Sequence, residues 1–120
     1  VFHQMEGVRL FAPEDLQRRK DELLATVQST PAINGMSAAS FPPEYDPSLC
    51  RLALADLYLT LSGLLQFLFG STTVALWQLT YFPFTQPSLE VEISQTDQPD
   101  KLIEVFGSGI LQRSVLPEAV

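Results

Sequence analysis

Cysteine and basic residues are scarce in this chain of 120 residues, and each scarcity excludes a class of protein. The single cysteine, Cys50, excludes an internal disulfide and a zinc site built from several cysteines. Seven Lys and Arg against fourteen Asp and Glu give a net charge of −7 and a pI near 4.4. Because so acidic a surface repels phosphate, we expect this segment not to bind nucleic acid directly.

An uninterrupted apolar run of membrane-spanning length is also missing. The most apolar stretch, residues 52–69, contains Asp56 and several polar residues, whereas a bilayer span takes about 20 mainly apolar residues. We interpret it as a buried helix and expect no membrane association. The chain begins at Val1 with neither a basic nor a signal-type run, so we expect a piece of a longer protein.

Apolar periodicity predicts one strand and two helices in the first two thirds of the chain. Residues 1–11 alternate as a strand does, and residues 12–27 change to helical spacing after Pro13. A second helix is predicted to begin at Pro47, capped by Asp46, and to stop at Gly70. Its apolar stripe consists of Leu54, Leu57, Leu61, Leu64, Leu65 and Leu68.

The last third predicts strands over 72–79, 88–94 and 101–106, with 95–100 as the turn of a hairpin. Residues 29–47, rich in turn-forming residues, are interpreted as a surface loop or insertion. The fold class expected is α+β, in one domain. It consists of an antiparallel sheet of about four strands with two helices packed on one face.

Two aromatic segments are candidates for ligand binding. On a strand, Phe2, Gln4 and Glu6 point to the same side about 7 Å apart, where they could stack a planar ring and hold an ammonium group. An edge strand with a polar solvent face is the alternative. Residues 81–88, with two prolines and three aromatic residues, could line a pocket for an aromatic ligand or cap the core.

Acidic and glycine-rich positions on the later strands are less specific. Glu90, Glu92 and Glu104 could hold a magnesium ion or form a solvated strand face. The run 107–109, Gly-Ser-Gly, lacks the third glycine of a dinucleotide-binding fingerprint, so a close backbone approach to a ligand or a plain turn remains. The only histidine, His3, has no evident triad partners and is interpreted as structural.

Four segments, taken in order, resemble the phenylalanine–tRNA ligase family, in its catalytic α-type chain. Residues 2–7 resemble FHQxEG, the return strand of class II motif 2, and residues 81–88 resemble YFPFTxPS. Residues 88–93 and 103–109 resemble the strands PSxEVxV and LEVLGCG that follow, with Ser108 in place of the cysteine. Gln86 stands where the family often has an acidic residue. Residues 8–11 are closer to the single-chain organellar form.

The resemblance implies a class II ligase that activates phenylalanine with ATP and Mg²⁺ and charges tRNA(Phe). The residues it implies for phenylalanine are Gln4 and Glu6 at the ammonium group, Phe82 and Phe84 at the ring, and Thr85, Gly107 and Gly109 at the pocket floor. Those it implies for ATP are Phe2 at the adenine and Glu104 on the magnesium side.

It also implies that the two phosphate-binding arginines lie outside this segment, before Phe2 and after Val120. Arg113 is not the second of them, because a strand precedes it. We therefore expect the segment alone to be inactive.

A non-catalytic module that binds a small molecule or a protein is the alternative function. The organellar likeness implies a mitochondrial or plastid matrix location, with the cytoplasm as the alternative.

Overall fold

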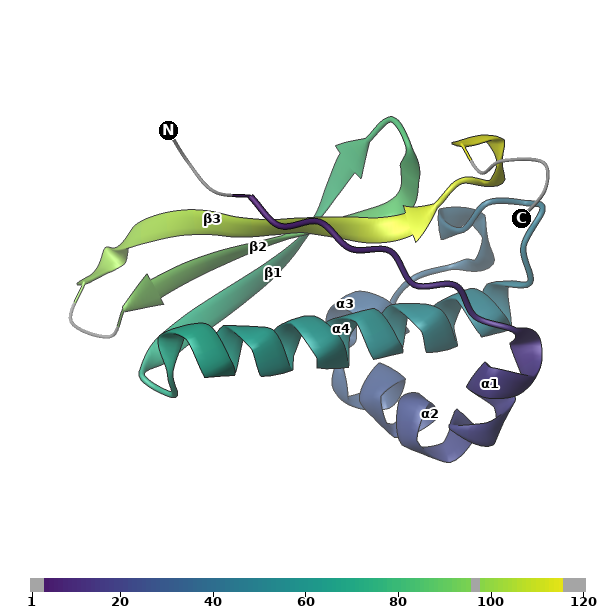
Figure 1. The fold of residues 1–120 in the computed structure, drawn as a ribbon, viewed down its shortest axis with the longest axis horizontal. Coiled ribbons are helices and arrows are strands. Elements are labelled where there is room, and N and C mark those ends of the chain that lie inside the picture. The colour runs from purple at the N-terminus through teal and green to yellow at the C-terminus, as the bar shows by residue number, and fades with distance from the viewer. Residues whose placement is uncertain (1–3, 96–97, 116–120) are drawn as a thin grey trace.

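The computed structural model describes residues 4–95 and 98–115, and two short helices are its first regular elements (Figure 1). α1 (Pro13–Arg18) has its proline at the first position, as predicted, and α2 (Lys20–Ser29) follows. The sequence predicted one helix over this stretch. Arg19 separates the two, with φ −103° and ψ 16° outside the helical range, and its side chain binds Asp56 instead.

The long helix α4 (Pro47–Phe69) has the boundaries predicted for it. The Asp46 carboxylate accepts a hydrogen bond from the Ser48 backbone N–H at 3.0 Å, which satisfies one of the free donors of the first turn. Gly70 ends the helix with φ 80°, a conformation that glycine adopts without strain. Both signals are local, which is why the sequence reveals them.

The interpretation of residues 29–47 as a surface loop is wrong for several of its side chains. This stretch contains α3 (Pro31–Asn34) and a 3₁₀ turn, η1 (Ala38–Ser40). Ile33, Met36 and Phe41 are buried in the main core cluster. Their spacing follows neither a helical nor a strand period, so periodicity could not identify them as core residues.

The sheet has three antiparallel strands in the order β1 (Thr73–Phe82), β2 (Thr85–Gln95) and β3 (Gln98–Leu111). The pairing of Gln95 with Gln98 agrees with the predicted hairpin, whose residues 96–97 lie outside the described chain. The fourth strand is not formed: residues 4–10, the described part of the predicted first strand, have no strand structure. A strand is stable only beside a partner, and none of the described strands pairs with them.

The helices pack on one face of the sheet, as predicted (Figure 1). Leu89 of β2 joins the core formed by the helices, and Leu65 of α4 contacts Val91 and Ile93 further along β2. Because side chains alternate along a strand, Glu90 and Glu92 point to the opposite face. That open face, free of helices in the described chain, carries the candidate site.

α4 is only partly buried. Leu54 and Leu65 are buried as the stripe predicts, but Leu68 is 55% exposed and Phe67 is 84% exposed at the far end. α4 is the one described helix long and apolar enough to cross a membrane, which is weak evidence because core helices meet the same criterion. The buried and ion-paired Asp56 at its middle fits a helix packed in a protein core.

Candidate functional site

An aromatic pair lies where the chain reverses between β1 and β2. The ring centroids of Phe82 and Phe84 are 6.0 Å apart, with 12° between the ring planes. Phe84 is 49% exposed, while Phe82 is half-buried. The sequence placed both residues in a ligand pocket, and the structure brings them together as a stacked pair with one ring accessible.

The ring of Phe82 rests directly against the backbone of β3 at Gly107. A Cβ atom at this position would lie 2.9 Å from the Phe82 Cζ atom, closer than packed carbons come. Gly107 pairs with Glu90 across the sheet, so the ring lies on the open face. The alternative of a plain turn at residues 107–109 is wrong, since they belong to the strand β3.

Thr85 and Gly109 meet beside this pair. Thr85 is buried, and a Cβ atom at Gly109 would clash with the carbonyl oxygen of Pro87 and lie 2.8 Å from the Thr85 Cβ atom. The backbone of β3 therefore touches the reversal at two glycines. Of the pocket residues expected from the sequence, Phe82, Phe84, Thr85, Gly107 and Gly109 come together.

Ser88 was not expected to have a role, yet its hydroxyl holds the reversal in shape. The Ser88 Oγ atom accepts a hydrogen bond from the Phe82 N–H at 3.2 Å and donates one to the Thr85 carbonyl oxygen at 3.1 Å. It also lies 2.5 Å from the Thr85 Oγ1 atom. In the sequence, Ser88 is a small polar residue between two strand-forming runs. That pattern is too common to predict a structural role for its hydroxyl.

A cleft of about 270 Å³ opens beside the reversal. It lies next to the aromatic pair, but Phe82 and Phe84 do not line it. Its lining is formed by Thr80, Tyr81, Thr85, Gln86, Pro87, Ser88 and Gln112.

The expected ammonium-binding residues lie together but outside regular structure. Gln4 donates from its Nε2 atom to the Glu6 Oε1 atom at 3.2 Å, and both side chains are exposed. In the described chain, neither makes a hydrogen bond to the reversal that carries Phe82. Phe2, expected at the adenine, and His3, interpreted as structural, lie outside the described residues.

Three carboxylates gather on the open face. Glu92 pairs with Glu104 across the sheet. The pKa of Glu90 is raised, first by partial burial and then by the negative charges of Glu104 and Glu92. No group of three acidic, histidine or cysteine side chains in the described residues is arranged to hold a metal ion, so these carboxylates are not a ready-made magnesium site.

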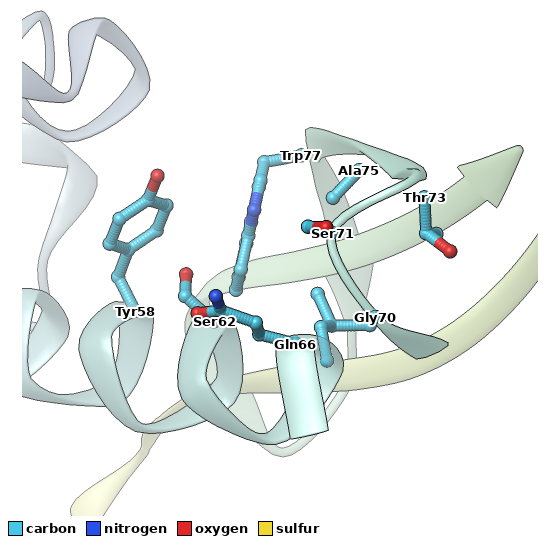
Figure 2. A pocket seen from close by; sticks show the side chains of 9 residues that line it. Tyr58, Ser62, Gln66, Gly70, Ser71, Thr73, Ala75 and Trp77 are labelled. Carbon is cyan, nitrogen blue, oxygen red and sulfur yellow. The ribbon is translucent and has the colours of Figure 1, made fainter. Parts of the chain in front are cut away.

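A second cleft, of about 370 Å³, lies between the end of α4 and β1 (Figure 2). Its walls include the rings of Tyr58 and Trp77, whose centroids are 4.7 Å apart. No pattern in the sequence indicated this cleft, although Trp77 is the only tryptophan. No charged side chain lines this cleft, so it lacks the groups that would bind phosphate or a zwitterion.

Cys50 is not a nucleophile at neutral pH. It is buried in the main core, and burial raises the pKa of its thiol to about 11. A thiol with so high a pKa remains protonated and unreactive. The candidate chemistry therefore belongs to the open face of the sheet.

Comparison with known proteins identifies the fold that carries this face. Residues 50–119, more than half of the chain, match the family model for the class II core domain of tRNA synthetases (F). The chain belongs to this family. The match covers α4 from residue 50 onward and the whole sheet, and the α+β architecture agrees with a class II core.

Individual relatives extend the likeness to nearly the whole chain. It is 33% identical over 99% of its length to the mitochondrial phenylalanine–tRNA ligase of Mus musculus, and 35% identical over 99% to the chloroplastic/mitochondrial phenylalanine–tRNA ligase of Arabidopsis thaliana. It is 41% identical over 58% to the phenylalanine–tRNA ligase alpha subunit of Oenococcus oeni. The chain spans only 25%, 21% and 22% of these relatives, respectively. No solved structure matches it.

Proposed function

We propose that this class II synthetase segment belongs to a phenylalanine–tRNA ligase and supplies its phenylalanine pocket. The observation that carries the proposal is the open sheet face, where Phe82 stacks on Phe84 and rests against Gly107, in a chain whose relatives with 99% coverage bear that name. An aromatic surface of this kind suits a phenyl ring. Such a surface rejects tyrosine only to a limited degree.

In this proposal the phenyl ring of the substrate meets Phe82 and Phe84 edge to face, above a floor formed by Thr85, Gly107 and Gly109. Gln4 and Glu6 receive the ammonium group, because a carboxylate and an amide oxygen are acceptors for its three donors. Phe2 stacks on the adenine.

The reaction is the attack of the phenylalanine carboxylate on the α-phosphate of ATP, which releases pyrophosphate. The phenylalanyl group is then transferred to tRNA(Phe), and AMP is released. Mg²⁺ bound with ATP would neutralise phosphate charge, and Glu104 is the candidate in this chain for that side. The residues of this segment bind and orient the amino acid, while catalysis in such a reaction combines this positioning with stabilisation of the phosphate charge. With its net charge of −7, the segment leaves tRNA contacts to other parts of the polypeptide.

We place the protein in a mitochondrial or plastid matrix, because relatives with 99% coverage of the chain carry organellar names. Fractionation of cells with a tagged full-length protein tests this location. Recovery in the cytoplasmic fraction would contradict it.

The test of the function is phenylalanine-dependent ATP–pyrophosphate exchange by the full-length protein. Glu6→Gln should raise the phenylalanine KM about tenfold or more, since it removes one partner of a charge-assisted pair, and should leave the ATP KM nearly unchanged. Phe84→Ala should lower the selectivity for phenylalanine over tyrosine and a bulkier para-substituted analogue.

Phe67→Ala is the matched control, because Phe67 is equally aromatic but lies 84% exposed on the distant end of α4. It should leave the KM and the selectivity unchanged. Absence of phenylalanine-dependent exchange in the wild-type protein would refute the ligase and favour the non-catalytic binding module. Exchange that Glu6→Gln and Phe84→Ala leave unaltered would keep the ligase but refute this pocket.

A further inference from the structure

Asp56 is a buried carboxylate in the middle of the apolar helix α4. Its side chain is 6% exposed, although the surrounding positions of the helix are mostly leucine and alanine. A carboxylate is retained in such surroundings only if it is paired, because desolvating an unpaired charge is very unfavourable. Its partners therefore indicate what it does.

Two arginines from different segments each bind one oxygen of Asp56. The Nη1 atom of Arg19, between α1 and α2, lies 2.5 Å from the Oδ1 atom. The Nη1 atom of Arg9 lies 3.3 Å from the Oδ2 atom. Arg19 also pairs with Glu22 of α2, so its bond to Asp56 joins the junction of α1 and α2 to α4. The bond of Arg9 attaches an extended segment to α4, since Arg9 lies in no helix or strand.

Arg9 is the attachment point of the extended segment 4–10. Every residue of this segment is exposed, and in the described chain the Arg9–Asp56 pair is its one hydrogen bond or ion pair to a helix or strand. The Arg9 guanidinium also lies 4.8 Å from the centroid of the Phe11 ring, which restricts its orientation. Glu6 is three residues away, at most about 10 Å along an extended chain.

We propose that Asp56 and Arg9 are positioning residues for the amino-acid site: by fixing Arg9 on α4, Asp56 holds the segment that presents Gln4 and Glu6 to the ammonium group. This inference rests on the proposed function. Neither residue touches the substrate. The pair acts by fixing where the backbone of residues 4–10 runs. The exposed Arg9 side chain can do this because the Asp56 carboxylate that it binds is buried in the core.

Arg9→Gln in the full-length protein tests the proposal, and we expect this variant to fold. Asp56 keeps Arg19 as its partner in this variant, so no buried charge is left unpaired. We expect the phenylalanine KM to rise about tenfold, and at most about 100-fold, because misplaced binding groups cost that much. The value of kcat should change less than about twofold, because Gln4 and Glu6 are proposed to bind the amino acid and not to take part in the reaction. The ATP KM should rise less than the phenylalanine KM, because Phe2 is the one ATP group proposed at this end of the chain. Arg9→Lys, which keeps a charge for Asp56, should recover part of the loss.

Arg19→Gln is the matched control. It removes the other partner of the same carboxylate and loosens the contact between α1, α2 and α4, but leaves Arg9 attached. It should lower the melting temperature and leave the phenylalanine KM near the wild-type value. An unchanged KM in Arg9→Gln, or an equal rise in both variants, would overturn the proposal.

Cleavage after Glu6 by a glutamate-specific protease gives a readout that does not require activity. The cut should be faster in Arg9→Gln than in the wild type and Arg19→Gln, because a released segment enters a protease more readily. Equal rates in all three would overturn the positioning role. A wild-type protein without phenylalanine-dependent exchange would instead refute the proposed function, so the two failures are distinguishable.

Discussion

Gly107 determines the position of the aromatic ring beside it. The ring of Phe82 occupies the space in which a side chain at position 107 would begin. In Gly107→Ala we expect the ring to shift, because the end of a side chain yields more easily than backbone. The phenylalanine KM should rise severalfold, while the melting temperature changes little. Amino-acid activation and thermal unfolding of the full-length variant measure both.

Gly63→Ala is the control for this substitution. Nothing lies within 4 Å of a Cβ atom built at Gly63 on α4, so the change should stabilise the helix by about 0.5–1 kcal/mol and leave the KM unchanged. If Gly107→Ala bound phenylalanine as the wild type does, Phe82 would not be a wall of the pocket.

Ser108 is a second residue whose side chain should affect a measurable quantity, the free energy of unfolding. It pairs with the buried Leu89, so it faces the helices rather than the open face. Its buried Oγ atom has no hydrogen-bond partner among the described residues. Ser108→Ala should therefore raise the free energy of unfolding by about 1 kcal/mol, because it removes an unsatisfied polar group. Chemical denaturation checks this, and a loss of stability would show that the hydroxyl is bonded in the full-length protein.

At this scale the sequence predicted the residues of the reversal better than the contacts between distant residues. Phe82, Phe84 and Gly107 belong to recognisable motifs. The pairing of Asp56 with Arg9 and Arg19 joins residues 47 and 37 positions apart, and no local pattern records such a contact. In the sequence, Asp56 was only an interruption of an apolar run.

Among the secondary-structure elements, the prediction of α4 is confirmed, whereas the described residues of the strand predicted over 1–11 form no strand, and both outcomes have one physical reason. A helix forms its hydrogen bonds within itself, so Asp46, Pro47 and Gly70 are enough to locate its ends. A strand takes its hydrogen bonds from a neighbour. The alternation in residues 1–11 therefore describes how these residues would lie in a sheet, without supplying the partner.

The cap of α4 makes its stability depend on pH. Hydrogen bonds from the Ser48 side chain and backbone lower the pKa of Asp46 below its ordinary value. A carboxylate with a lowered pKa stabilises the folded state above its unfolded-state pKa, and this contribution is lost as the pH falls through the folded-state pKa. Asp46→Ala should thus lower the melting temperature at pH 7, and the difference should shrink as the pH falls below the ordinary aspartate pKa of about 3.9.

Asp46→Asn separates the charge from the hydrogen bond. Its amide oxygen still caps the helix but does not titrate in this range, so its melting temperature should vary less with pH than that of the wild type. Thermal unfolding between pH 7 and pH 3 measures all three proteins. A constant gap between Asp46→Ala and the wild type across this range would argue against the cap.

For the molecule as a whole, the prediction is that residues 1–120 alone do not activate phenylalanine. The family resemblance places both phosphate-binding arginines outside them, and binding of the amino acid without phosphate stabilisation does not accelerate the attack. ATP–pyrophosphate exchange with the isolated segment should stay at background, with the full-length protein as the positive control. Exchange above background would refute it.

The sheet of three strands also leaves β1 without a neighbour on one side in the described chain, and this has a consequence for handling the segment. Residues 73–82 contain no charge, proline or glycine, and Val74, Leu76 and Leu79 are exposed. Such an edge is a template on which a second copy can add its own strand, which leads to aggregation. Leu76→Lys should therefore keep the isolated segment dispersed in light scattering at concentrations where Leu68→Lys, an equally exposed change on α4, does not. In the isolated segment, this uncharged edge strand is an aggregation-prone surface.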